Sequence, residues 1–380
     1  MTPPDEDDDR AERTTLLTRE QLAAALAAED DVRPYLVGVD GAAAGRYLEI
    51  TATPITIGRG TQQVLTVVDP DISRFHLQVS LVDGRAVVED MGSTNGTFVK
   101  DERISAPRVL QHGDTLRAGR QVFRFERVRR QDAERALRLA NDLDVAAGYV
   151  LALLPPPLTS GLVRTAWHFA PSVELGGDGF GYAWLDADTF VCYLIDVSGH
   201  GAGSAMHSVT VLNLLRQRAL PGADFANPAD VLTHLNARFQ MEAHSELYFT
   251  MWYGVYRPSS RTLTYASAGH HPAYLVPADR SDAQPLKLRT LAIGMMTDTP
   301  YATAETTVPE GAALYLFSDG AYEIDTPDGA MWGLNDFVPL LTASTQPETT
   351  EPVRLYRAVT SAAGRDPLAD DFSMLVLSFI

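Results

Sequence analysis

The hydrophobic pattern changes twice along the chain. Between residues 35 and 128, short apolar runs such as Phe75–Val82 and Val122–Val128 alternate with turn sequences rich in glycine, asparagine and aspartate. Many short strands at this spacing are typical of a β-sandwich or a barrel. We therefore predict an all-β domain over residues 35–128.

A helical period follows over Arg129–Leu154, where apolar residues recur at alternating spacings of four and three. The stripe consists of Ala136, Ala140, Leu143, Ala147, Val150 and Leu154. Prolines at 155–157 end it, so residues 129–157 are predicted to form a helical linker. The spacing resembles that of a coiled coil, and two interpretations stay open: packing on one of the chain's own domains, or a homodimer contact.

Residues 158–380 mix both patterns. Strands are predicted at Val163–Ala170, Phe190–Ile195, Tyr248–Tyr256, Thr262–Ser267, Ala313–Phe317 and Ser373–Phe379, and helices at Ala202–Ala219, Pro228–Glu242 and Pro352–Ala363. Strands follow one another across short turns, which favours an antiparallel α+β domain over repeated βαβ units.

The start of the chain is different in character. Residues 1–13 are acidic and lack large apolar side chains after Met1, which predicts disorder. A short helix is expected from Thr18 to Ala28, so that residues 1–34 form a tail and helix ahead of the first domain. No apolar run reaches the ~20 residues of a membrane span, and the acidic opening is unlike a secretory leader. We expect a cytoplasmic protein that does not bind membranes.

Composition narrows the choice of partners and cofactors. The formal net charge is −18, and without a concentrated basic patch this disfavours nucleic acid as a partner. A single cysteine, Cys192, rules out an internal disulfide and a zinc site built from cysteines. Because it lies in an apolar run, we expect it to be a small buried residue.

Three polar motifs fall at turns of the predicted β-domain: Gly58-Arg59, Ser73-Arg74-Phe75-His76, and Gly92-Ser93-Thr94-Asn95-Gly96-Thr97. Guanidinium and hydroxyl groups on adjacent loops can hold a phosphate. In this order the motifs resemble the forkhead-associated (FHA) family, whose domains are eleven-stranded sandwiches that bind phosphothreonine peptides. The resemblance implies that Arg59, Ser73 and Arg74 contact phosphate, that Thr94 and Asn95 hold the peptide, and that His76 braces the loops.

Acidic motifs recur in the second half of the chain. They are Asp178 in a Gly-Gly-Asp sequence, Asp196 in Asp-Val-Ser-Gly-His-Gly, Asp319 in Ser-Asp-Gly, and the pair Asp370-Asp371. Several of them adjoin apolar runs, so predicted core strands deliver carboxylates to the rim of one domain. Converging carboxylates repel one another and need a cation, and oxygen ligands select Mg²⁺ or Mn²⁺. Two such ions can activate a bridging water for attack on a phosphate.

With Ser267-Ala268-Gly269-His270, Leu291–Gly294 and Ser318–Glu323, these motifs resemble the SpoIIE-like bacterial branch of the PPM metal-dependent phosphatases. The resemblance implies an α-β-β-α sandwich over residues 158–380, with two Mn²⁺ or Mg²⁺ ions at one edge. The implied metal ligands are Asp178, Asp196, the Val197 carbonyl, Asp319, Asp370 and Asp371, of which Asp178 and Asp196 are also the expected catalytic residues.

The resemblance implies a protein serine/threonine phosphatase that acts on a signalling protein, such as an anti-sigma-factor antagonist. Phosphothreonine binding to the FHA domain would target or regulate it, with the linker helix as the route of control. One residue departs from the pattern, because Gly181 stands where members of the family often have a second acid. This leaves open an inactive phosphatase fold that serves as a phosphothreonine-binding adaptor, and a phosphoesterase of small molecules.

Overall fold

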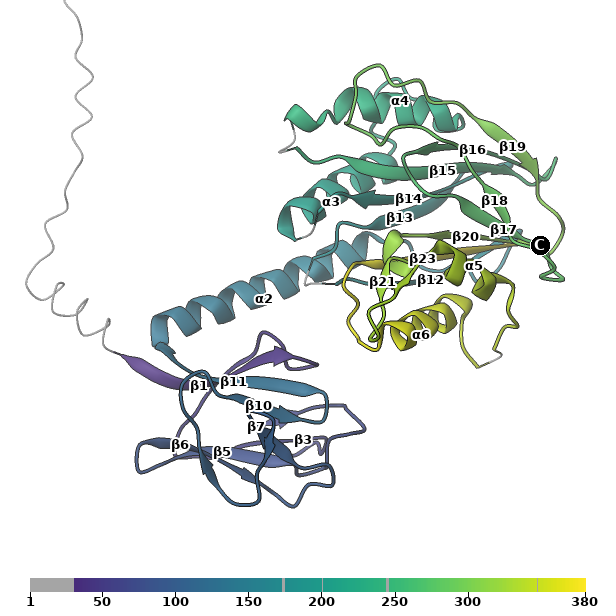
Figure 1. The fold of residues 1–380 in the computed structure, drawn as a ribbon. Coiled ribbons are helices and arrows are strands. Elements are labelled where there is room, and N and C mark those ends of the chain that lie inside the picture. Colours follow the sequence, from purple (N-terminus) through teal and green to yellow (C-terminus); the bar gives the residue numbers. More distant parts are fainter. Residues whose placement is uncertain (1–30, 173–174, 200, 244–245, 347) are drawn as a thin grey trace, which may run out of the picture. The chain divides into compact units, whose positions relative to one another are not determined.

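The computed structural model describes residues 31–172, 175–199, 201–243, 246–346 and 348–380. The predicted acidic tail and the helix at Thr18–Ala28 lie outside these residues. The chain divides into two compact units between Asn141 and Asp142, each drawn in Figure 1. Among the described residues, no helix combines the length and hydrophobicity that crossing a bilayer requires.

The N-terminal unit is a β-sandwich of a six-stranded sheet, in the order β2-β1-β11-β10-β7-β8, and a five-stranded sheet, in the order β4-β3-β5-β6-β9. The strands are β1 (Val32–Asp40), β2 (Tyr47–Glu49), β3 (Ile55–Gly58), β4 (Leu65–Thr66), β5 (Leu77–Val82), β6 (Arg85–Asp90), β7 (Thr97–Val99), β8 (Glu102–Arg103), β9 (Arg108–Val109), β10 (Thr115–Ala118) and β11 (Gln121–Arg129). Alternate side chains, such as Leu77 and Val79 on β5, are buried between the sheets. The predicted all-β sandwich is confirmed.

The first strand starts earlier than the sequence pattern indicates. We expected the β-domain from residue 35, but β1 begins at Val32 and includes Pro34. A proline removes one backbone donor but keeps its carbonyl. Here the Pro34 carbonyl accepts a hydrogen bond from the Ile50 amide at 2.8 Å, which keeps it within the sheet.

The linker is one helix, α2 (Arg130–Leu153), which matches the predicted segment to within one residue at each end. Its later turns belong to the C-terminal unit, where Ala147 and Val150 pack with Leu175 and Ala205. This part of the apolar stripe is therefore used for packing within the chain's own domain.

The C-terminal unit stacks two antiparallel five-stranded sheets, in the orders β13-β14-β15-β16-β19 and β12-β23-β20-β17-β18. Their strands are β12 (Val163–Ala170), β13 (Gly179–Asp186), β14 (Thr189–Val197), β15 (Phe249–Arg257), β16 (Thr262–Ala268), β17 (Ala273–Val276), β18 (Gln284–Leu286), β19 (Ala304–Thr307), β20 (Ala313–Phe317) and β23 (Phe372–Phe379). A small hairpin pairs β21 (Ile324–Asp325) with β22 (Met331–Trp332).

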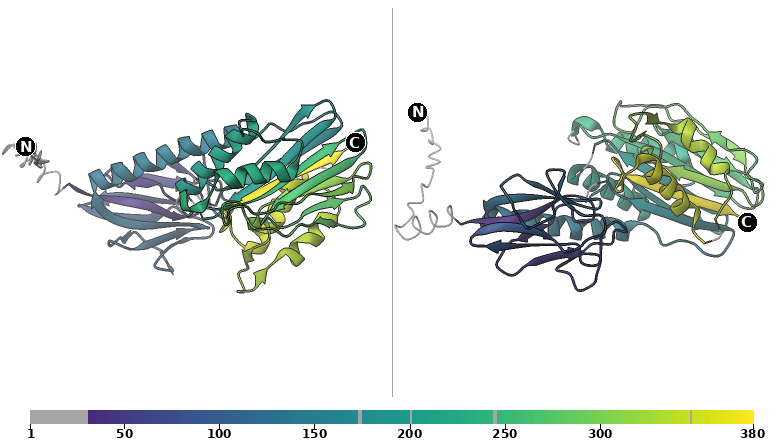
Figure 2. Two further views of the ribbon diagram at one scale, coloured as in Figure 1. Left: turned by 90° about the horizontal axis from the view of Figure 1, so that it is seen from above. Right: turned by 60° about the horizontal axis from the view of Figure 1, so that its bottom comes forward.

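Helices cover the outer face of each sheet (Figure 2). Helices α3 (Ala202–Arg216) and α4 (Pro228–Arg238) pack on the β13–β19 sheet, and α5 (Leu334–Thr342) and α6 (Glu351–Ala363) pack on the other. Short 3₁₀ turns, η1 (Met241–Ala243) and η2 (Asp319–Ala321), complete the unit. The predicted α-β-β-α sandwich is confirmed.

The lone cysteine, Cys192, lies on β14 between the two sheets. Burial raises the pKa of its thiol to about 12, so the thiolate is not populated at neutral pH. The expectation of a small buried residue is correct.

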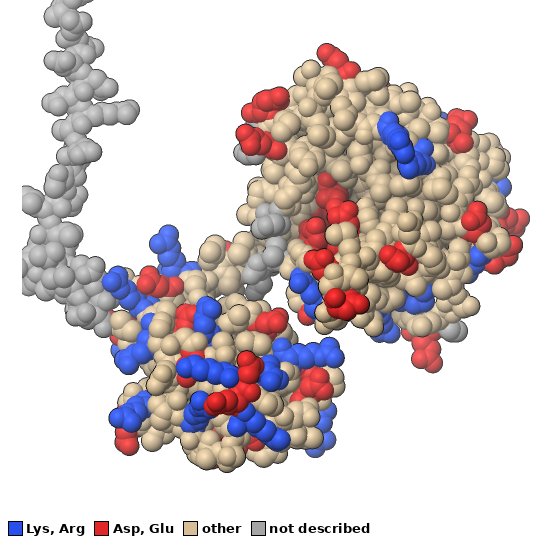
Figure 3. Space-filling view, in the orientation of Figure 1, with Lys and Arg blue, Asp and Glu red and all other residues tan. Residues whose placement is uncertain are grey.

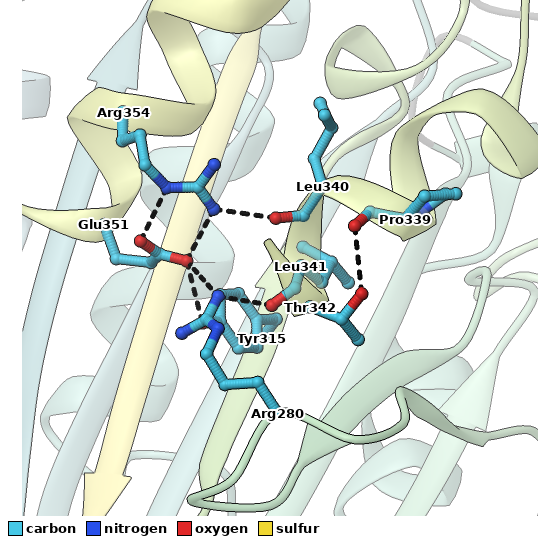
Figure 4. A network of polar contacts seen from close by, with 8 residues as sticks. All are labelled: Arg280, Tyr315, Pro339, Leu340, Leu341, Thr342, Glu351 and Arg354. Atoms are coloured by element: carbon cyan, nitrogen blue, oxygen red, sulfur yellow. Dashed lines mark hydrogen bonds and ion pairs between the residues drawn. The ribbon is translucent and has the colours of Figure 1, made fainter. Parts of the chain in front are cut away.

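A buried ion-pair network fastens the helical layer formed by α5 and α6 (Figure 4). The Glu351 carboxylate accepts hydrogen bonds from Arg280 at 2.6 Å and from Arg354 at 2.7 Å, and Tyr315 on β20 donates to it at 3.1 Å. The two guanidiniums also donate to the carbonyls of Leu340 and Leu341 on α5. Burial alone would raise the pKa of Glu351, but hydrogen bonds from the two arginines outweigh it and lower that pKa below 4.5.

We predict that Glu351→Gln destabilises the C-terminal unit by about 3 kcal/mol, because two largely buried guanidiniums lose their shared counter-charge. Chemical denaturation of wild type and variant measures the difference. The control is Glu310→Gln, at an exposed position, for which a change within about 0.5 kcal/mol is expected. Equal stability of the two variants would contradict the prediction.

Candidate active site

The acidic motifs of the C-terminal unit lie at the ends of core strands from both sheets. Asp178 directly precedes β13, and Asp196 is the penultimate residue of β14. From the other sheet, Asp319 follows β20 after one residue, and Asp370-Asp371 directly precede β23. Residues separated by almost two hundred positions are thus brought to one edge of the sandwich.

A cavity of about 320 Å³ opens there, here called the acidic cavity. Its lining residues are Asp196, Val197, Ser198, Gly199, Tyr248, Thr250, Asp319, Ala369, Asp370 and Asp371. None of these described lining residues is Lys or Arg, and the space-filling view shows acidic side chains gathered in a hollow of this unit (Figure 3). Five of the six residues predicted as metal ligands line this cavity.

The sixth, Asp178, is not among the lining residues and is only 2% exposed. One of its carboxylate oxygens, Oδ2, is buried without a hydrogen-bond partner. Burial raises the pKa of this carboxyl well above 3.8, and the nearby charges of Asp196 and Asp371 raise it further. An unsatisfied buried carboxylate next to others is the condition that a bound cation would relieve.

Asp196 and Asp319, which line the acidic cavity, also have raised pKa values. Burial raises the pKa of Asp196 from 3.8 to about 8, with further contributions from the charges of Asp319 and Asp370. Burial raises the pKa of Asp319 to about 6, and the charges of Asp370 and Glu323 add to it. The cluster therefore holds more negative charge than its surroundings stabilise, and it fits a hard divalent cation by donor type and charge.

Asp371 differs from the other acids because its oxygens are already engaged. It accepts hydrogen bonds from the Ser172 amide at 2.8 Å, the Ser172 hydroxyl at 3.0 Å and the Gly177 amide at 2.7 Å. These bonds hold the backbone next to Asp178. They favour a positioning role for Asp371 over direct ligation.

Within the described ranges of the chain, no three Asp, Glu, His or Cys side chains already converge as ligands of one metal ion. The carboxylates are instead presented separately on the cavity walls. Their fit to a cation thus rests on their chemistry, their charge and the orphaned oxygen of Asp178.

Sequence reasoning missed the neutral wall of the acidic cavity. Thr250 stands opposite Asp196 in the β14–β15 register. The Ser198 amide donates to the Tyr248 carbonyl at 2.9 Å, and the Tyr248 amide donates to the Ser198 hydroxyl at 3.1 Å. Only strand register reveals these neighbours. Glu323, whose amide donates to the Asp319 carbonyl at 2.8 Å, was visible in the Ser318–Glu323 motif but was given no role.

Gly181 does not belong to this site. It lies on β13 opposite Tyr193 and lines a different cavity. A Cβ at this position would come within 2.3 Å of the Tyr193 hydroxyl oxygen. The glycine at position 181, where the family often has an acid, therefore leaves the lining of the acidic cavity unchanged.

In the N-terminal unit, the three polar motifs meet at one end of the sandwich. The Arg59 amide donates to the Ser73 carbonyl at 3.0 Å, and the Thr94 amide donates to the Ser73 hydroxyl at 3.0 Å. Gly58 allows this approach, because a Cβ there would lie 2.3 Å from the Arg74 carbonyl oxygen. Buried His76 bonds the Ser73 amide through Nδ1, and its Nε2 lies 3.1 Å from the Gly96 carbonyl, consistent with its expected bracing role.

The groups predicted to meet a phosphopeptide are accessible. Arg59 and Arg74 are exposed, and neither has a carboxylate partner among the described residues. Asn95, also exposed, donates to the Asp71 carbonyl at 2.8 Å. We expected Phe75 to begin the β-type run Phe75–Val82, but β5 begins at Leu77 and Phe75 is 57% exposed. It forms an apolar surface beside Arg74 that the sequence pattern did not reveal.

Comparison with known families matches residues 186–380, about half of the chain, to the model of Stage II sporulation protein E (SpoIIE). Residues 55–119 match the FHA domain. Asp178 precedes the first of these matches, so its assignment rests on the geometry described above.

The curated relatives include two proteins of Bacillus subtilis (strain 168). Phosphoserine phosphatase RsbP is 26% identical over 191 residues, covering 49% of this chain and 46% of that protein. Phosphoserine phosphatase RsbU is 26% identical over 208 residues, covering 54% and 60%. The chain thus spans about half the length of these relatives.

The FHA domain-containing protein FhaB of Mycobacterium tuberculosis (strain ATCC 25618 / H37Rv) is 31% identical over 86 residues, covering 23% of this chain and 56% of that protein. Among solved structures, the SiaA-PP2C domain of Pseudomonas aeruginosa is 22% identical with a TM-score of 0.55, covering 64% of this chain and 98% of that one. This likeness supports the fold of the C-terminal unit.

The raised pKa of Asp196 predicts a pH-dependent stability in metal-free buffer. A carboxyl with a folded-state pKa of about 8 and an unfolded value near 3.8 stabilises the fold below pH ~4, and this contribution is lost as the pH rises toward ~8. In EDTA, Asp196→Asn should therefore become more stable than wild type as the pH rises, by at least about 1 kcal/mol at pH ~8.

Denaturation at a series of pH values measures this gain. The exposed Asp282→Asn variant is the matched control and should follow wild type. Parallel pH profiles for Asp196→Asn and wild type would show that the carboxylates do not repel one another as described.

Proposed function

The chain belongs to the Stage II sporulation protein E (SpoIIE) family, and we propose that it is a metal-dependent protein serine/threonine phosphatase regulated through its FHA domain. The acidic cavity carries the proposal. Its described lining residues include four aspartates and no cationic side chain. A phosphate ester is itself an anion, so it can enter this cavity only together with cations.

The residues that would hold two Mn²⁺ or Mg²⁺ ions are Asp178, Asp196, Asp319 and Asp370, with the Val197 carbonyl. When bound, such ions lower the pKa of a water nucleophile and neutralise the phosphate that it attacks. Asp196 is the central acid, since its pKa responds to the charges of Asp319 and Asp370 from the opposite sheet. Asp371 keeps the backbone at Gly177 in place beside them.

We propose phosphoserine or phosphothreonine on a signalling protein as the substrate, for example an anti-sigma-factor antagonist. The names of RsbP and RsbU, both phosphoserine phosphatases, support this choice. The FHA domain is a second argument, because a phosphopeptide-binding module suits a macromolecular target better than a small metabolite.

The alternative of an inactive adaptor rested on Gly181 alone. Gly181 faces the Tyr193 hydroxyl and lines a different cavity, so it gives no reason to expect loss of a ligand. Control through the linker is part of the proposal, because α2 begins in one unit and ends in the other. A homodimer through the predicted stripe is less favoured, since Ala147 and Val150 already pack within the C-terminal unit.

The purified chain with Mn²⁺ should hydrolyse p-nitrophenyl phosphate and phosphoserine peptides, and Asp196→Asn should lower kcat by at least about a hundredfold, because one carboxylate would hold both ions. Phosphate release measures the rate. Asp282→Asn, which removes an exposed carboxylate, should retain wild-type activity. Full activity in Asp196→Asn would refute the mechanism, and hydrolysis without any divalent ion would refute metal dependence.

Phosphothreonine binding is tested with an immobilised library of degenerate phosphothreonine peptides. Arg59→Ala should reduce capture of the full chain by about tenfold or more, because a charge-assisted contact to phosphate is lost. The control is Arg85→Ala, an exposed arginine at the start of β6 outside the three motifs.

The same peptides should change the phosphatase rate of wild type and leave the rate of Arg59→Ala unchanged. Capture of the unphosphorylated library to the same extent would contradict phosphothreonine recognition. Capture without any change of rate would show that the FHA domain targets the enzyme and does not regulate it.

A further inference from the structure

A second cavity, of about 260 Å³, lies in the C-terminal unit beside β13, the edge strand of its sheet. We call it the tyrosine cavity. The lining residues that matter here are Gly181, Tyr193, Leu215, Arg216, Arg218 and Tyr253. Tyr193, Leu215 and Tyr253 are buried, whereas the two arginines are exposed. The cavity therefore has an apolar, aromatic interior and a basic rim.

The charge of this rim is opposite to that of the chain as a whole. Arg216 and Arg218 are the charged residues among the described lining residues, in a protein with a net charge of −18. Neither forms an ion pair with a carboxylate in the described part of the chain. Arg218 donates one hydrogen bond, to the Trp184 carbonyl at 2.8 Å, and its remaining donors can serve a ligand.

The tyrosine cavity also contains a hydroxyl group that is available to a ligand. The rings of Tyr193 and Tyr253 stack in parallel, with centroids 5.8 Å apart and an interplanar angle of 2°. The Tyr253 hydroxyl donates to the Phe225 carbonyl at 2.9 Å, whereas the Tyr193 hydroxyl has no hydrogen-bond partner among the described residues. Gly181 leaves the space that this hydroxyl occupies, because any Cβ there would collide with it.

We propose that the tyrosine cavity binds a small aromatic carboxylic acid. The ring would enter the apolar interior beside Leu215 and the stacked tyrosines, and the carboxylate would face the two guanidiniums, whose planar geometry suits it. A cavity of ~150 Å³ accommodates a benzene molecule, so about 260 Å³ has room for one ring with a short acidic chain. This site is separate from the acidic cavity and does not depend on phosphatase activity.

Isothermal titration calorimetry of the full chain tests the site with 4-phenylbutyrate and, as its uncharged counterpart, 4-phenylbutan-1-ol. Wild type should bind the acid about tenfold or more tightly than the alcohol, because charge-assisted hydrogen bonds are the stronger kind. Arg216→Gln/Arg218→Gln should remove this preference while leaving the weak binding of the alcohol unchanged.

The matched control is Arg164→Gln/Arg289→Gln, which removes two exposed arginines that do not line the cavity. It should bind the acid as wild type does. The single variant Arg216→Gln disturbs no hydrogen bond of the described structure and replaces the double variant if that one unfolds. It should weaken binding of the acid and leave binding of the alcohol unchanged.

Three results would overturn the proposal. One is no binding of the acid at millimolar concentration, and another is equal affinity of wild type for acid and alcohol. The third is an affinity for the acid that Arg216→Gln leaves unchanged.

Discussion

Repulsion between carboxylates that are held close together with little water is the constraint on which the proposed chemistry depends. The strands next to Asp178 and Asp196 hold the two residues close together. Burial disfavours the ionised form of each carboxyl group and so raises its pKa. A protein gains nothing in stability from such a cluster. In the proposed mechanism, divalent cations would bind at the cluster because they relieve this repulsion, and a phosphate group would enter only together with them.

The rest of the C-terminal unit can be understood as the frame that keeps these acids together. Asp196 lies on β14 in one sheet, and Asp319 lies just after β20 in the other, so the cavity exists only while the two sheets stay stacked. The apolar layer between the sheets provides most of that attraction. Outside it, Glu351 and its two arginines fix α5 and α6, while Asp371 uses its own charge to secure the backbone before Asp178.

Sequence patterns predicted the elements whose apolar runs are continuous, and they did so closely: Val163–Ala170 and Ala313–Phe317 coincide with β12 and β20. They missed β13, whose glycines at 179 and 181 weaken the strand signal although its neighbour β14 supplies full pairing. The acidic members of the site could be found because carboxylates at strand ends are conspicuous. Thr250 could not, because its place beside Asp196 depends on the register of two strands.

The order of strands has a consequence for how this unit matures. β23, the final strand in sequence, lies between β12, the first strand of the unit, and β20. During synthesis, β12 therefore has no partner strand in its sheet until residues 372–379 leave the ribosome. Asp370 is synthesised just before them. Because Asp370 and Asp371 directly precede β23, the acidic cavity is complete only once this late strand has joined its sheet.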